Sequence, residues 1–272
     1  MNQFETDWLD LREPADRRAR NGVIAARLAS RFKDADGLTV VDLGCGTGST
    51  ARAIAGLLPG PQRWRLVDHD EGHLARARTA LAGLTDRDGR AIALETCRAD
   101  LSAGVPTALL DGCGLIATSA FFDLVSRGFL ERLAATAAAR GIPLYAALTV
   151  DGRLACEPPD PLDRAVFDAF NAHMGRDKGF GPACGPRAPD TALHVLRQRG
   201  FRVEAGRSDW SVGADEPEFA IRLLDGWTAA AAETGLVDPA ELARWSRRRH
   251  AEIAAGTARF EVGHLDILAL PD

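Results

Sequence analysis

The segment TVVDLGCGTGST, residues 39–50, constrains the fold of this chain more than any other part of the sequence. The β-branched run at 38–43 predicts a buried parallel strand, and residues 49–58 predict a helix that ends before Pro59. The three glycines between them let the backbone approach a ligand that a Cβ would obstruct. The segment therefore predicts an α/β fold with a binding site after its first strand, although strand-to-helix turns also use glycine for structural reasons alone. These glycines are Gly44, Gly46 and Gly48.

Segments of the same two kinds alternate along the rest of the chain. Apolar, β-rich runs predict strands at 64–67, 91–95, 114–118, 143–148, 201–210 and 259–270. Apolar spacing predicts helices at 13–32, 70–84, 127–139, 160–173, 190–199, 216–233 and 239–254, with a glycine- and proline-rich loop at 174–189. This alternation predicts a mostly parallel sheet with helices on both faces.

Composition narrows the class of function. The net charge of −5 and the pI of 5.7 argue against a nucleic-acid partner and favour a small-molecule substrate. The content of hydrophobic residues is 46%, without an apolar run long enough for membrane insertion, and the start of the chain lacks the apolar core of a signal peptide. The five cysteines are widely separated, without metal-ligand spacing. We expect a cytoplasmic protein with reduced thiols and no metal site.

Acidic residues follow the first three expected strands. The GCGTG turn differs from the GxGxxG of dinucleotide sites, and Asp42 before it suits a cationic amino-acid ligand. Asp68 ends the second strand, where its two oxygens suit the hydroxyls of a ribose. Asp100 suits an adenine amino group, with Leu101 as a backbone donor, although Asp100 is also typical of a turn. The pattern indicates an adenosylmethionine site rather than a dinucleotide site.

Four segments give the sequence a family resemblance. VVDLGCGTGST, LVDHDEGHLARA, CRADL and LIATSAFFDLVS occur in this order between residues 38 and 148. In them the sequence resembles the class I adenosylmethionine-dependent methyltransferases. The resemblance implies a Rossmann-like, seven-stranded sheet with an antiparallel last strand, and S-adenosyl-L-methionine as cofactor, with S-adenosyl-L-homocysteine as its product. It also implies cofactor contacts at Gly44, Cys45, Gly46 and Gly48 (methionine and ribose), Asp68 (ribose), His69 (adenine face), Asp100 and Leu101 (adenine edge), and Ser119 and Ala120 (near the sulfonium). For His69, an ordinary solvent-facing position is the alternative.

The segment LREPADRRARN adds charged residues ahead of the first strand. Arg12, Asp16 and Arg20 are spaced to lie on one side of the expected helix at 13–32, where Asp16 orients either arginine. Some methyltransferases grip the cofactor carboxylate with an arginine of an amino-terminal helix. Arg20 or Arg12 is the candidate here, with a solvated helix face as the alternative.

We expect a single methyltransferase domain over residues 1–272. It comprises an amino-terminal helical segment at 1–37, a cofactor-binding half at 38–150 and a substrate half at 151–272. The substrate half contains a helical insertion at about 213–258, whose apolar stripes must be buried. With the 174–189 loop, the insertion is predicted to form a cap over the acceptor pocket, and a homodimer interface or an extended core is the alternative. The stripes comprise Ile221, Leu224, Trp227, Leu242, Trp245 and Ile253.

The acceptor chemistry is less constrained. Methyl transfer is an in-line displacement, so alignment and removal of water supply much of its acceleration, and a base is optional. Candidate bases are Asp123, His173 and Lys178; a turn cap, a helix end and a surface charge are the respective alternatives. The fourth strand ends in TSAFFD and lacks the (D/N)PP(Y/F) of enzymes that methylate base amines or glutamine. We expect a small-molecule acceptor with an oxygen or nitrogen nucleophile.

Other interpretations stay open. The basic cluster RWSRRRH at 244–250 suits either an anionic substrate or a solvated helix face. A protein that binds adenosylmethionine without catalysis is harder to exclude than an NAD-dependent oxidoreductase. The latter needs GxGxxG and machinery such as a catalytic tyrosine, and the only tyrosine is Tyr145, within an expected strand.

Overall fold

The structure, a computed structural model, describes residues 6–271, so residues 1–5 of the expected amino-terminal helical segment and residue 272 lie outside it. The strands are β1 (Leu38–Leu43), β2 (Gln62–Asp68), β3 (Ala93–Arg98), β4 (Leu115–Ser119), β5 (Leu144–Glu157), β6 (Phe201–Arg207), β7 (Trp210–Val212) and β8 (Arg259–Pro271). The α-helices are α1 (Thr6–Ala19), α2 (Gly22–Arg31), α3 (Ser49–Ile54), α4 (Glu71–Ala80), α5 (Arg127–Ala139), α6 (Asp163–Met174), α7 (Ala188–Gln198), α8 (Pro217–Thr234) and α9 (Pro239–Ala254). Short 3-10 helices lie at Ala55–Leu57, Thr107–Leu110 and Gly185–Arg187.

The strands form one sheet in the order β3-β2-β1-β4-β5-β8-β6, with β7 paired to β8. β1 to β5 are parallel, and β8 runs antiparallel to β5, β6 and β7. The expected Rossmann-like sheet with an antiparallel last strand is confirmed, but it has eight strands rather than seven. The expected strand at 201–210 is divided into β6 and β7. Between them, the backbone N–H of His264 in β8 donates to the side-chain carboxylate of Asp209 at 3.0 Å instead of to a backbone carbonyl of a neighbouring strand.

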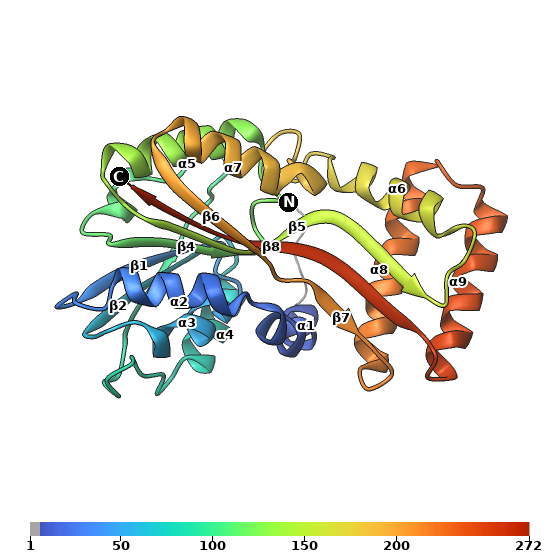
Figure 1. Cartoon of the computed structure of the whole chain (residues 1–272), viewed down its shortest axis with the longest axis horizontal. Coiled ribbons are helices and arrows are strands. Elements are labelled where there is room, and N and C mark those ends of the chain that lie inside the picture. Colours follow the sequence, from blue (N-terminus) through green and yellow to red (C-terminus); the bar gives the residue numbers. More distant parts are fainter. Residues whose placement is uncertain (1–5, 272) are drawn as a thin grey trace.

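Helices cover both faces of the sheet (Figure 1). On one face, apolar residues of α5 and α7 such as Leu133 and Val195 pack with Val41 of β1 in one buried cluster. On the other face, residues of α2, α3 and α4 such as Leu28 form a second cluster with Val40. Because neighbouring residues of a strand point to opposite faces, the apolar residues of β1 contribute to both cores.

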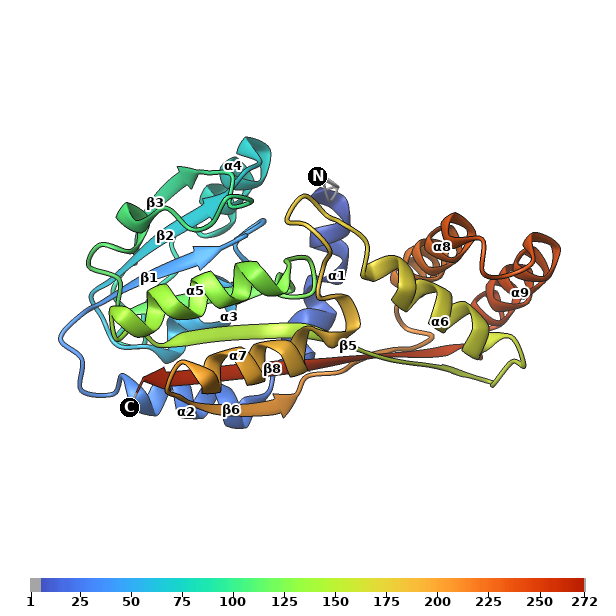
Figure 2. The ribbon, with the colours of Figure 1, turned by 90° about the horizontal axis from the view of Figure 1, so that it is seen from above.

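At one end, β5 and β8 continue beyond the other strands and carry α6, α8 and α9 (Figure 2). β5 extends to Glu157, well past the expected end at 148, and is irregular between Ala146 and Thr149. The helices, β7 and the outer parts of β5 and β8 share a third apolar cluster, to which Ala15 of α1 also belongs. We call this part the helical extension: α6, α8, α9 and the strand segments 150–157 and 259–262.

The two expected insertion helices are present as α8 and α9. Five of the six apolar residues expected to be buried are buried: Leu224, Trp227, Leu242, Trp245 and Ile253. The prediction is wrong for Ile221, which is 38% exposed. The buried stripe of α8 runs through Ala220, Leu223, Leu224 and Trp227, so Ile221 lies one position off that face.

The basic cluster at 244–250 holds the helical extension together. Arg249 is fully buried and donates to both carboxylate oxygens of Asp163, at 2.7 and 2.8 Å, and to Glu252. Arg248 donates to Asp160 at 2.7 Å. A solvated face is therefore the wrong interpretation for Arg249, which joins α9 to α6.

The amino-terminal segment forms two helices instead of the single helix expected at 13–32. α1 includes Pro14 in its interior and ends at Ala19, and α2 begins at Gly22. The side chain of Asn21 accepts from the N–H groups of Val23 and Ile24, and this cap starts the second helix. The break places Arg20 between the two helices.

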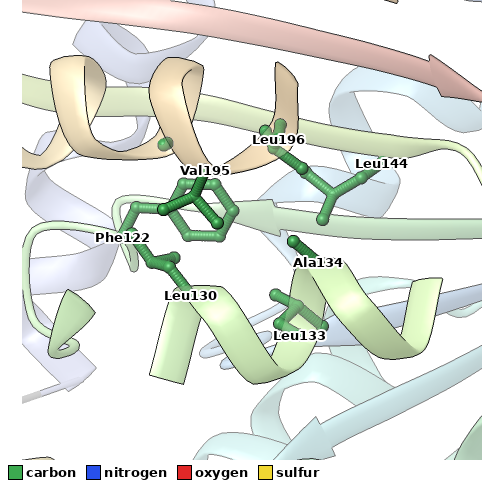
Figure 3. A pocket seen from close by; sticks show the side chains of 8 residues that line it. Phe122, Leu130, Leu133, Ala134, Leu144, Val195 and Leu196 are labelled. Atoms are coloured by element: carbon green, nitrogen blue, oxygen red, sulfur yellow. The ribbon is translucent and has the colours of Figure 1, made fainter. Parts of the chain in front are cut away.

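A small cavity of about 10 Å³ lies between α5, α7 and β5. Figure 3 shows that apolar side chains surround it, among them Phe122, Leu133 and Val195. The volume is about that of one water-sized sphere, and an apolar cavity of this size stays dry. It is a packing defect of the core rather than a ligand site.

Among residues 6–271, no helix combines the length and the apolar character needed to cross a membrane.

Candidate functional site

The glycine turn after β1 is fixed to β2 by backbone contacts. The N–H of Cys45 donates to Val67 O at 3.0 Å, and that of Gly46 donates to Asp68 Oδ2 at 2.9 Å. Gly44 has a φ of 65°, and a Cβ there would lie 2.8 Å from the ring of Phe121. A Cβ at Gly46 would lie 3.2 Å from the side chain of Leu9 on α1. The turn thus needs glycine for its backbone conformation and for the close approach of these side chains.

Asp42 lies beneath this turn at the end of β1. It is fully buried, and within the described part of the chain neither carboxylate oxygen has a hydrogen-bond partner. Burial raises the pKa of Asp42 to about 7, against the lowering influence of Thr50 and Arg20. A buried carboxylate without partners is costly, and a nearby cation compensates for it. Asp42 therefore supplies an electric field that favours a cation above the turn.

Asp68 is part of a dense hydrogen-bond arrangement at the end of β2. Besides Gly46, it accepts from the backbone N–H of Asp70 at 3.0 Å, and Nδ1 of His69 lies 3.3 Å from its Oδ1. Desolvation opposes ionisation of Asp68, but the hydrogen bonds from His73 and from the two backbone groups lower its pKa. Asp68 is therefore an ionised acceptor that also shapes the turn.

The adenine-side candidates differ in exposure. Asp100 is exposed and accepts from the N–H of Ser102 at 2.9 Å, which lowers its pKa and matches the turn role that the sequence left open. Leu101 is buried in the apolar cluster under α5, so its side chain is not available to a ligand. His69 is half-exposed, beside Asp68.

Arg20 reaches the turn from the break between α1 and α2. Its Nη2 donates to Ser49 Oγ at 3.3 Å and to Ser119 Oγ at 3.2 Å, which joins the start of α3 to the end of β4. Its Nε and Nη1 are buried, and neither has a hydrogen-bond partner among residues 6–271. Interactions with Tyr145, Asp266 and Asp16 raise the pKa of Arg20 despite the opposing effect of burial. A buried guanidinium that stays charged is suited to a carboxylate.

The end of β4 is strained next to Ser119. Ala120 has a φ of 48°, in the left-handed region that non-glycine residues rarely adopt. Such strain costs of order 1 kcal/mol and tends to occur at functional positions. Phe121, which follows, packs edge-on against Phe129 and Phe180, with ring centroids 5.8 and 5.7 Å away. This aromatic contact attaches the 174–189 loop to the β4 end of the site.

Asp123 lies just beyond these rings. It is buried, and its Oδ1 has no hydrogen-bond partner in the residues that the structure describes. Burial raises the pKa of Asp123 to about 6, while Arg12 and Lys178 act in the opposite direction. Burial lowers the pKa of Lys178. The pKa shifts of Lys178 and Asp123 therefore both favour the neutral form of the side chain. Of the three candidate bases, Asp123 is the buried carboxylate with a free oxygen.

His173 has a partner in the helical extension. Its Nε2 lies 2.9 Å from Glu233 Oε2 of α8, and Arg176 donates to the backbone O of the same residue at 2.9 Å. These contacts join the end of α6 to α8. They account for His173 without a role in proton transfer.

Helix α1 crosses the site between the sheet and the helical extension (Figure 2). Its Glu13 binds Arg52 of α3 through both carboxylate oxygens, and Asp10 pairs with Arg76 of α4 at 2.9 Å. On its other side, Trp8 packs against Phe219 of α8, with ring centroids 5.5 Å apart. α1 therefore contacts both parts of the molecule.

Comparison with known proteins adds to this geometry. The sequence matches no protein-family model and no curated protein. Among solved structures, a cyclopropane-fatty-acyl-phospholipid synthase-like protein of Lactobacillus casei is similar with a TM-score of 0.53 and 16% identity, over 93% of this chain and 91% of that one. The YcgJ protein of Bacillus subtilis has a TM-score of 0.50 and 12% identity, over 92% and 99%. A cyclopropane synthase of Mycobacterium tuberculosis has a TM-score of 0.46 and 12% identity, over 91% and 83%.

The strand order completes the assignment, because β8 lies between β5 and β6 and runs against both. The chain has the class I adenosylmethionine-dependent methyltransferase fold. In this methyltransferase fold, the glycine turn, Asp68 and Arg20 all lie at the carboxyl ends of parallel strands, where ligands of open α/β sheets bind.

Sequence reasoning missed several residues of this region. Ser49 is the partner of Arg20, and its place directly after Gly48 at the start of a helix was an available signal. Nothing local predicted that Phe121 and Leu9 cover the turn.

Tyr145 is buried and donates to Asp266 at 3.2 Å, and burial raises its pKa, so it lacks the environment of a catalytic acid in an oxidoreductase.

Proposed function

We propose that the protein is an adenosylmethionine-dependent methyltransferase that acts on an oxygen or nitrogen atom of a small molecule. The observation that carries the proposal is the buried guanidinium of Arg20 near the glycine turn, whose Nε and Nη1 have no hydrogen-bond partner within residues 6–271. A buried donor without an acceptor costs about 1–3 kcal/mol, so a partner is expected there. The carboxylate of adenosylmethionine has the matching shape and charge.

The residues at the turn fit the remaining groups of the cofactor. Asp42 favours the cationic amino group through its field, and Asp68 offers an ionised acceptor to the ribose hydroxyls. His69 and the backbone of Leu101 lie towards the adenine, together with Asp100, and Ser119 and Ala120 lie towards the sulfonium. Leu9 and Phe121 cover the glycines, so entry of the cofactor requires these side chains to move.

Adenosylmethionine supplies an electrophilic methyl group, whose bond to sulfur breaks with its electron pair as the acceptor lone pair bonds to the carbon. Asp123 holds a free oxygen on the acceptor side, and we assign it the proton that the acceptor hydroxyl or amine loses. The aromatic rings of Phe121, Phe129 and Phe180 exclude water beside this position. Lys178 stays close enough to lower the pKa of Asp123 and stabilises its ionised form.

Titration calorimetry with adenosylhomocysteine, adenosylmethionine and NAD tests the cofactor assignment. We expect saturable binding of the first two and none of NAD. Transfer of labelled methyl groups to a panel of metabolites then tests catalysis, and Asp123→Asn should lower turnover with little change in the dissociation constant of adenosylhomocysteine. Binding of adenosylhomocysteine without transfer to any acceptor would favour a non-catalytic binding protein instead. Binding of NAD alone would refute the proposal.

A further inference from the structure

Arg12 of α1 lies close to the carboxylate of Asp16 and to the ring of Trp210. Its Nε lies 3.2 Å from Asp16 Oδ2, and its guanidinium carbon lies 5.7 Å from the centre of the Trp210 ring. The indole N–H of Trp210 donates to the other oxygen of Asp16 at 3.0 Å. Asp16 is buried, so both oxygens of one carboxylate position the arginine and the ring beneath it. A guanidinium fixed in this way presents its N–H groups in one defined plane.

The pairing of Arg12 is incomplete. Its contact with Asp16 lacks hydrogen-bond geometry, and its buried Nε has no hydrogen-bond acceptor. Apart from Asp16, no residue in the described part of the chain forms an ion pair with it. An arginine in a position this enclosed, with a side chain only 15% exposed, therefore retains donors for a ligand.

Asp123 faces the same region with the opposite charge. Arg12 is close enough to lower the pKa of Asp123, but the described structure shows no ion pair of 4.0 Å or less between them, and Asp123 Oδ1 is unpaired. Burying opposite charges without letting them meet costs desolvation and gains little attraction. A molecule between them, with a donor for Asp123 and an anion for Arg12, would satisfy both groups.

On the basis of the methyltransferase activity proposed above, we propose that the methyl acceptor is a small organic acid. Its carboxylate pairs with Arg12, and its hydroxyl or amine lies against Asp123. A carboxylate matches the site because one planar fork binds it through two parallel hydrogen bonds. A phosphate dianion needs further fixed cations, and the other nearby one, Lys178, is a group whose pKa burial lowers. The two arginines of the amino-terminal segment thus have separate ligands, with Arg20 on the cofactor and Arg12 on the acceptor.

Matched pairs of acceptors test this inference. The panel comprises 3-hydroxybenzoate, 3-aminobenzoate, lactate and glycine, each with its carboxamide, and 3-hydroxyphenyl phosphate as a phosphate probe. With adenosylhomocysteine bound, we expect the acids and not the amides to raise the thermal midpoint saturably. With labelled adenosylmethionine, we expect at least one acid to be methylated, and its amide at least about 30-fold less efficiently, as for loss of a charge-assisted pair.

Variants of α1 provide the controls. Arg12→Met should lower kcat/KM for the acid about 30-fold and leave the dissociation constant of adenosylhomocysteine within twofold. Arg12→Lys, which keeps the charge without the fork, should recover part of the loss and guards against a merely unfolded variant. Arg18→Met is the matched control, because Arg18 lies on the same helix, is 53% exposed and pairs with Glu216. It should change neither quantity.

The outcomes separate the two proposals. If adenosylhomocysteine does not bind the unmodified protein, the proposed function itself fails. If it binds, three results would each overturn the organic-acid inference: equal use of acids and amides, a preference for the phosphate probe, or neither stabilisation nor methylation by any acid. An unchanged kcat/KM for the acid in folded Arg12→Met would remove Arg12 from its recognition.

Discussion

Substitution of Arg20 by methionine isolates the contact that carries the cofactor assignment. Its Nε and Nη1 are buried and unpaired, whereas its Nη2 is used by Ser49 and Ser119. Nε and Nη1 lie on different edges of the guanidinium, so a carboxylate gains one new charge-assisted hydrogen bond from them, which contributes roughly 1.5–3 kcal/mol. Its loss predicts a change of about 2 kcal/mol, or a roughly 30-fold rise in the dissociation constant of adenosylhomocysteine in Arg20→Met.

The assay is titration calorimetry with two ligands. Adenosylhomocysteine carries the carboxylate, and 5′-methylthioadenosine keeps the nucleoside and the sulfur but lacks the amino-acid end. Only the first should lose affinity in Arg20→Met, because the substitution removes a partner of the carboxylate alone. Arg27→Met is the control, since Arg27 is 65% exposed on α2 and pairs with Glu204 at 3.4 Å. It should bind both ligands normally.

The reasoning fails if folded Arg20→Met binds adenosylhomocysteine with unchanged affinity. It also fails if both ligands lose affinity equally, because that result would mean a general loss of structure near Tyr145 and Asp266. Thermal midpoints of each variant distinguish local from global effects.

Other expectations concern single carboxylates and the loop. Asp68→Asn should weaken adenosylhomocysteine binding by about 2–3 kcal/mol in a folded protein, measured by calorimetry; unchanged affinity would contradict the ribose assignment. Because burial raises the pKa of Asp42 to about 7, its contribution to the stability of the ligand-free chain is present below pH 4 and lost as pH rises through 7. Urea unfolding should show this loss, which Asp42→Asn should reduce, and cofactor affinity should rise over the same range. The pKa of Asp123, raised by burial to about 6, predicts that kcat/KM rises with pH through 6, and a flat profile would exclude it as the base. Phe180→Ala should speed proteolysis at 175–187, and bound adenosylhomocysteine with acceptor should slow cleavage of the unmodified loop; equal cleavage in all states would argue against a cap.

The sequence alone determined the sheet and the position of its ligand turn. β1 and the helices at 127–139 and 239–254 were predicted at their observed bounds, because apolar periodicity and glycine or proline boundaries are local signals. The helix expected at 70–84 begins at Asp70, whose side chain accepts from His73 N–H at 3.1 Å and caps α4, which is an equally local interaction. Asp42, Asp68 and the glycines were identified because they lie at or directly after the ends of strands.

Only the tertiary structure decided which partner each of the charged residues has. Arg12 and Arg20 are equivalent in spacing, yet a helix break directs Arg20 to Ser49 and Ser119 while Asp16 and Trp210 hold Arg12 elsewhere. Trp210 and Asp16 are far apart in sequence, so no local pattern relates them. Likewise, the sequence alone is compatible with Arg249 as a surface charge, whereas in the fold Arg249 donates a hydrogen bond to Asp163 of α6. Folding brings together residues that are distant in sequence, and these residues determine how deeply a charged group is buried and which partner it has. Burial and partner in turn set the pKa and the role of that group.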